Sequence, residues 1–166
     1  MRKSLILAVF MASLVFAQTA SHKSTAKRPA KTTAAAIVTT PDNIQWTDAP
    51  PFLSPGAKLA VLSGNPNAAG PFVGRLKLPD GYRVMPHWHP TAENVTVLSG
   101  EFRVAMGDKF DESQLKGLPA GSYASIPTHH NHYGMAKGET VIQINAMGPF
   151  KLIYVNPADD PSKTKK

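Results

Sequence analysis

The stretch that decides the fold runs from residue 81 to residue 100 and reads GYRVMPHWHPTAENVTVLSG. His87 and His89 are two residues apart, and on a β-strand such side chains leave the same face about 6.6 Å apart. Glu93 has the same parity as the two histidines. Pro90 has no backbone N–H to donate to a neighbouring strand, which indicates a turn or bulge that places the Glu93 carboxylate beside the two rings. The two imidazoles and the carboxylate are therefore expected to converge on one ion.

The ligand types narrow the choice of ion. Two imidazoles and a carboxylate suit a divalent transition metal, namely Mn, Fe, Co, Ni or Zn. Val95 and Val97 continue the same strand face and are expected to give the site an apolar lining. The chain has no Cys, which excludes disulfides, thiolate zinc sites, iron–sulfur clusters and cysteine nucleophiles.

A second histidine cluster follows in residues 121–133, which read GSYASIPTHHNHY. A Gly, a strand and a Pro deliver His129, His130 and His132 to a turn and the start of a neighbouring strand. At least one of the three is expected to reach the first group. A barrel interior offers a dry, concave place where four ligands hold an ion and leave positions open for water or substrate.

These residues resemble the two motifs of the cupin superfamily. The first motif is matched at all of its positions, by Gly81, His87, His89, Glu93 and Gly100. The second is matched by Gly121, Pro127 and His132, while His129 stands where the motif has Gly and Ala136 where it has Asn. The resemblance implies an all-β double-stranded β-helix, the jelly-roll barrel of cupins. It also implies a metal bound in the barrel mouth by His87, His89, Glu93 and His132.

The second cluster leaves two roles open. His130 shares the strand parity of His132, so a change of one residue in the turn could exchange them. His129 is expected to be a solvated turn residue, with a proton shuttle as the alternative.

The rest of the chain is typical of an all-β domain, because short apolar runs alternate with Gly, Pro, Asn and Asp. Nine strands are predicted, at 57–62, 72–78, 82–87, 94–98, 101–106, 122–126, 132–136, 140–146 and 150–155. A helical turn is predicted at 112–117. In the eighth strand Gln143 and Asn145 alternate with Ile142 and Ile144 on the opposite face, a pattern that suggests a wet inner face on which the two polar residues line a pocket.

The ends of the chain differ from its middle. Arg2 and Lys3 precede about a dozen apolar residues, which indicates a signal peptide over residues 1–17 with cleavage after Ala17. Residues 18–40 lack large apolar side chains and predict a flexible linker. A barrel domain is expected over 41–160 and a basic tail over 161–166.

The net charge of +7 comes from these ends, because nine basic residues lie in 1–40 and 161–166. Residues 41–160 hold nine basic and eleven acidic residues. We therefore expect no nucleic-acid partner, and no membrane partner after signal cleavage. The predicted location is the periplasm or the exterior.

These features predict an exported, metal-dependent enzyme that acts on a small molecule in the barrel mouth, of the dioxygenase, isomerase or lyase type that cupins include. The alternative is a non-catalytic module that binds or senses a metal or small ligand. A homodimer is also expected, because a jelly roll leaves strand edges to cover, here in residues 57–62 and 150–155.

Overall fold

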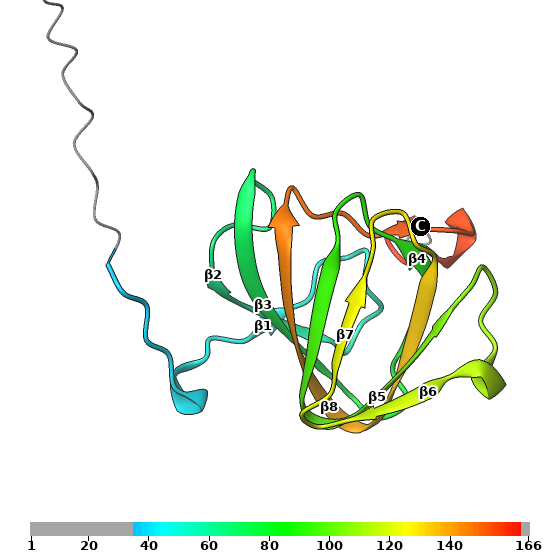
Figure 1. Ribbon diagram of the computed structural model, residues 1–166, viewed down its shortest axis with the longest axis horizontal. Coiled ribbons are helices and arrows are strands. Elements are labelled where there is room, and N and C mark those ends of the chain that lie inside the picture. Colours follow the sequence, from blue (N-terminus) through cyan, green and yellow to red (C-terminus); the bar gives the residue numbers. More distant parts are fainter. Residues whose placement is uncertain (1–34, 164–166) are drawn as a thin grey trace, which may run out of the picture. The chain divides into compact units, whose positions relative to one another are not determined.

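The computed structural model describes residues 35–163, which fold as β-strands joined by turns and three short 3-10 helices (Figure 1). The predicted signal peptide and most of the predicted linker lie outside the described residues, as do residues 164–166. The strands are β1 (Thr47–Asp48), β2 (Lys58–Ser63), β3 (Gly70–Leu78), β4 (Arg83–Trp88), β5 (Glu93–Met106), β6 (Lys116–Pro119), β7 (Tyr123–Ile126), β8 (His132–Gly148) and β9 (Ile153–Tyr154). The 3-10 helices are η1 (Pro41–Asn43), η2 (Glu112–Gln114) and η3 (Pro157–Asp159).

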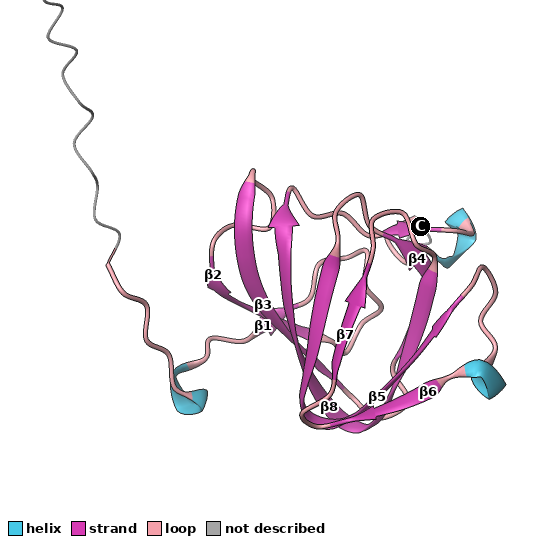
Figure 2. Ribbon diagram, viewed as in Figure 1, coloured by secondary structure: helices cyan, strands magenta, loops and turns pink. Residues whose placement is uncertain are grey.

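All the strand pairs are antiparallel, and β8 lies at the centre of the arrangement. The main path runs β1-β2-β3-β8-β4-β9, and β5 pairs with β6, β7 and β8. Figure 2 shows the long strands curving around a common interior, as in a barrel. The prediction of an all-β fold is therefore confirmed.

The two longest strands each join two strands that the sequence predicts separately. β5 covers the predicted pair at 94–98 and 101–106, and β8 covers the pair at 132–136 and 140–146. Gly100 and Gly138 have positive φ angles of 72° and 70°, a backbone region that Gly adopts without strain. Here these glycines bend continuous strands instead of ending them, and the β5–β8 register shifts between Val97 and Glu101.

The predicted elements differ from the structure in three smaller respects. The strands β1 and β6 were missed, because each is short and has no run of apolar residues. The helical turn predicted at 112–117 is η2 alone, and Lys116 and Gly117 already belong to β6. The strand predicted at 150–155 is reduced to two residues, β9.

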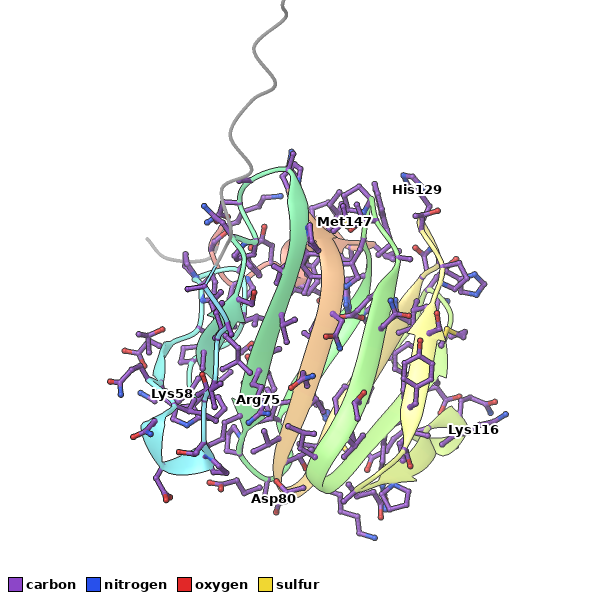
Figure 3. The ribbon with its side chains drawn as sticks, turned by 60° about the vertical axis from the view of Figure 1, so that its left-hand side comes forward. Lys58, Arg75, Asp80, Lys116, His129 and Met147 are labelled. Carbon is purple, nitrogen blue, oxygen red and sulfur yellow. The ribbon has the colours of Figure 1, made fainter. Side chains whose placement is uncertain are left out.

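The core follows the two-residue period of the strands. In β8, Ile142 and Ile144 are buried and line the interior, whereas Gln143 and Asn145 alternate with them and do not line the cavity. On the outer face the Nε–H of Arg75 donates to Oε1 of Gln143 at 3.0 Å, and Figure 3 shows Arg75 on β3. The polar row of β8 therefore stabilises the outside of the sheet, and a wet inner face is excluded.

Two tyrosines hold the segment before β2 against the barrel. The hydroxyl of Tyr82 donates to the carbonyl of Ser54, and that of Tyr154 to the carbonyl of Phe52, both at 2.7 Å. Burial raises the pKa of Tyr82 to about 12, so its hydroxyl keeps its proton at neutral pH. The two bonds fix the place of Phe52 and Leu53, which line the interior.

Among the described residues no helix is long and apolar enough to cross a membrane. The unit formed by residues 36–166 contains every described strand.

Candidate metal centre

Three histidines meet where β4 and β8 pair. His87 lies opposite His132 in the register of these strands, and His89 follows His87 by two residues, just after β4 ends. Each of the three side chains is buried, with at most 4% of its surface exposed. The strand parity read from the sequence thus brings both rings of the first motif to one place.

The rings are close enough to share one ion. Their centroids lie 4.1 Å apart for His87 and His132, 4.8 Å for His87 and His89, and 5.3 Å for His89 and His132. One nitrogen from each ring can be chosen so that the three lie within 4.8 Å of one another. This buried cluster could bind a metal ion.

Glu93 is the first residue of β5 and is also buried. Its Oε2 lies 3.3 Å from Nε2 of His132 and 3.6 Å from Nε2 of His89. The four side chains predicted from the sequence are therefore neighbours in the fold.

The outer nitrogen of every ring is bonded to a backbone carbonyl. Nδ1 of His87 lies 2.8 Å from the oxygen of Met85, and Nδ1 of His132 lies 2.9 Å from that of His130. Nδ1 of His89 lies 2.7 Å from the carbonyl of Lys151. A carbonyl oxygen only accepts, so each Nδ1 carries a proton and each ring turns its Nε2 inward.

This tautomer pattern tests whether the site fits a metal. Three Nε2 atoms and one carboxylate face one another, and these are atom types that divalent transition ions take as ligands. Nε2 of His89 is buried and has no hydrogen-bond partner among the described residues. A buried acceptor without a donor is costly. A cation at the centre satisfies all four groups at once, so the donor set fits a divalent transition ion.

The charge states agree with this arrangement. Burial, together with the nearby His132 and His89 rings, lowers the pKa of His87 to about 3, so its ring is neutral near pH 7. Burial alone would raise the pKa of Glu93, but the rings of His132 and His89 outweigh that effect and lower it. The site thus offers a neutral His87 ring and an ionised Glu93 carboxylate.

The remaining histidines of the second cluster point elsewhere. His130 is exposed, and it contributes only its backbone carbonyl, which fixes the His132 ring. His129 is exposed and has a φ of 58°, and its ring lies 4.8 Å from that of Trp88. Figure 3 shows His129 at one end of the barrel and Asp80 at the other. His132 is therefore the member that joins the cluster, and the exchange with His130 does not occur.

The cluster opens into a cavity of about 560 Å³ inside the barrel. All four buried polar residues, His87, His89, Glu93 and His132, line it. Most of the remaining wall is Val, Leu, Ile and Phe. The volume lies within the roughly 300–1,000 Å³ usual for small-molecule sites.

Sequence reasoning missed the aromatic support of the cluster. The ring of Phe150 stacks on His89, with centroids 4.3 Å apart and planes at 21°. Its N–H donates to the carbonyl of Pro66 at 2.7 Å, which ties the loop before β3 to the same place. The apolar character of residues 150–155 was visible in the sequence, but nothing local indicated contact with His89.

Together these features define an all-β, cupin-like double-stranded β-helix with a buried three-histidine cluster. Residues 13–153 match the family described as domain of unknown function DUF4437, and the chain belongs to that family. The fold class predicted from the sequence is confirmed.

Solved structures of several bacterial proteins share the fold. An RmlC-like cupin from Shewanella frigidimarina is 18% identical with a TM-score of 0.53, covering 68% of this chain and 91% of that chain. The polyketide cyclase RemF from Streptomyces resistomycificus is 15% identical with a TM-score of 0.63, covering 78% and 92%. A cupin-2 domain from Rhodospirillum rubrum is 15% identical with a TM-score of 0.55, covering 75% and 82%. No curated protein matches the chain.

Proposed function

We propose that the protein is a metal-dependent enzyme that binds one divalent transition ion through His87, His89, His132 and Glu93. Its substrate is a small molecule that enters the barrel cavity. The observation that carries the proposal is the convergence of three inward Nε2 atoms and one carboxylate on the wall of that cavity, with Nε2 of His89 lacking a hydrogen-bond partner among the described residues.

The metal would supply Lewis-acid or oxygen-binding chemistry at positions that the protein leaves open, as dioxygenases, isomerases and lyases require. Mn, Fe, Co and Ni accept more than four ligands and so retain such positions. Zn prefers four, so a Zn form held by all four side chains would be closed and inactive.

The chain's own residues prepare the site before any ion binds. The carbonyls of Met85, Lys151 and His130 hold the three rings with Nε2 inward, so little reorganisation accompanies binding. Glu93 brings one negative charge, which reduces the net charge of a bound divalent ion. Most of the other residues that line the cavity around the cluster are apolar.

The test uses metal-free protein loaded in turn with Mn, Fe, Co, Ni or Zn, with stoichiometry measured by elemental analysis. We expect one ion per chain, and we expect added azide to change the visible spectrum of the Co form by occupying an open position. A stoichiometry near zero contradicts the metal site. A Co spectrum that azide leaves unchanged contradicts a catalytic site and favours a structural ion or a binding module.

We also propose that the enzyme acts in the periplasm or outside the cell. The support is the order of Arg2 and Lys3, an apolar run and small residues before Gln18. N-terminal sequencing of protein recovered from the exported fraction should begin at Gln18. Retention of Met1 contradicts cleavage.

A homodimer is proposed as well, with an uncovered sheet edge as its support. β1 pairs only with Lys58 and Leu59 of β2, so among the described residues the rest of that edge of β2 has no strand beside it. Sedimentation at high micromolar concentration should show a dimer, and a monomer there contradicts the proposal.

A further inference from the structure

We propose that the substrate is a largely apolar, ring-containing molecule that has oxygen only at the end that reaches the metal. This inference rests on the proposed function for the role of that oxygen. Its own basis is the wall of the cavity, which is chemically different from the metal cluster.

The wall offers little to a polar ligand. Fourteen of the 24 lining residues carry Val, Leu, Ile or Phe side chains. Outside the metal cluster, the described lining residues include no Lys, Arg, Asp, Ser, Thr or Tyr, and their only polar side chains are those of Asn65 and Asn67. Oδ1 of Asn65 already accepts from the N–H of Asn67 at 2.9 Å.

This wall discriminates between ligand classes. A sugar or a sugar acid would bring several hydroxyl groups into a surface without partners for them, and each would lose its hydrogen bonds to water. A phosphate or sulfonate far from the metal would meet no cation among the described lining residues. An apolar skeleton has no hydrogen bonds to water to lose, and the burial of its surface favours binding.

The wall also favours rings over flexible chains. Four phenylalanines, Phe52, Phe72, Phe102 and Phe150, line the cavity. Phe150 stacks on His89 and meets Phe72 edge to face, with ring centroids 5.3 Å apart. Aromatic faces and edges therefore begin directly beside the metal cluster, where an aromatic ligand finds its preferred contacts.

The polar end of the ligand is fixed by the metal cluster. The Nδ1–H of each ring is already bonded to a backbone carbonyl, and the carboxylate of Glu93 repels a ligand carbonyl or phenolate oxygen. A cation at the centre attracts such an oxygen. Metal loading should therefore strengthen the binding of an apolar ligand that carries one oxygen.

The experiment compares three probes on metal-free and Co-loaded protein by calorimetry: β-naphthol, a disulfonated naphthol and glucuronate. We expect saturable binding of β-naphthol to both forms, tighter with the metal. The disulfonated naphthol should bind at least about tenfold more weakly, since its charges meet no cation in the wall. No saturable binding is expected for glucuronate.

A matched pair of variants locates the binding. Val61 of β2 lines the cavity and is 44% exposed, so Val61→Trp narrows the space without overfilling a closed core. Val73 lies opposite Ser63 on the neighbouring β3 and does not line the cavity, so Val73→Trp adds the same bulk elsewhere. Val61→Trp should weaken β-naphthol about tenfold and Val73→Trp should leave it unchanged.

The outcomes separate the two proposals because metal content is measured on the same samples. One ion per chain with no binding of β-naphthol, or with glucuronate binding as tightly, overturns the apolar substrate and leaves the metal site standing. Binding of β-naphthol by a Co-treated sample in which elemental analysis finds no bound ion overturns the proposed metal enzyme and leaves the apolar ligand standing. Equal effects of the two Trp variants would place the probe outside the cavity and overturn the inference.

Discussion

The two histidine clusters use the same residue type to different effect. His87 and His89 lie at the end of one strand, and both rings enter the site. In the second cluster only His132 does so, because it is the first residue of β8 whereas His129 and His130 occupy the turn before it. Strand alternation delivers every second side chain to one face, but a turn imposes no such rule.

The largest effect on metal affinity should come from replacing, one at a time, two histidines of the second cluster. His132→Ala removes one inward Nε2 and should lower metal affinity by at least roughly a hundredfold. His130→Ala keeps the backbone carbonyl that fixes the His132 ring, so its affinity should equal that of the wild type. Competition against a chromophoric chelator measures both constants. The reverse order, with His130→Ala losing the ion, would contradict the proposed ligand set.

Removal of the metal should lower stability in a way that depends on the cluster. An ion at a thousandfold excess over its dissociation constant stabilises the folded state by about 4 kcal/mol. Chelation should therefore lower the melting temperature of the wild type and of His130→Ala, and should change that of His132→Ala little. An equal response of all three proteins would mean that the ion lies elsewhere.

Glu93 allows a sharper test, because one substitution should have opposite effects on the two forms of the protein. In Glu93→Gln the amide can donate to Nε2 of His132, which lies 3.3 Å from the Glu93 carboxylate in the wild type. We expect a higher melting temperature for the metal-free variant and a metal affinity at least about tenfold lower.

Thermal scans with and without chelator, beside a metal titration, measure both effects of this substitution. An unchanged affinity would place Glu93 outside the ligand set. A lower melting temperature of the metal-free variant would show that a histidine ring already donates to the carboxylate of Glu93 when no ion is bound.

The pairing of His87 and His89 was predictable because strand spacing puts both rings on one face. Glu93 lies across a turn on β5, and it and His132 were placed by the cupin motifs and not by parity. The contact that fixes Nδ1 of His89 was not predictable, since Lys151 lies 62 residues away in the chain. The stacking of Phe150 on His89 likewise depends on the path of a loop that has no periodic signal.

The fold was predictable for a similar reason, and its errors lie where local signals mislead. Gly100 and Gly138 mark turns in the sequence, but in the structure they are bends within β5 and β8. Adding a Cβ to Gly100 would bring it 2.5 Å from the carbonyl oxygen of Glu139, so this glycine also serves a close strand contact. Only the partner strand makes that contact, and the partner is distant in sequence.

The smallest effect concerns His129, whose left-handed backbone sets the turn of the second cluster. Its φ of 58° costs an L-residue roughly 1–2 kcal/mol, and Gly avoids that cost. His129→Gly and His129→Ala both lose the ring contact with Trp88, so the difference between them reports the backbone alone. We expect the Gly variant to be more stable by about 1 kcal/mol, or about 3–5 °C in melting temperature.

Both variants should keep the wild-type metal content, because the exposed His129 ring is not part of the cluster and its N–H still donates to the carbonyl of His89. Chemical denaturation with parallel metal analysis provides the measurement. A Gly variant less stable than the Ala variant would show that the turn is not left-handed at this residue. The turn that keeps His129 and His130 out of the site would then need a different description from the one given by the φ of 58°.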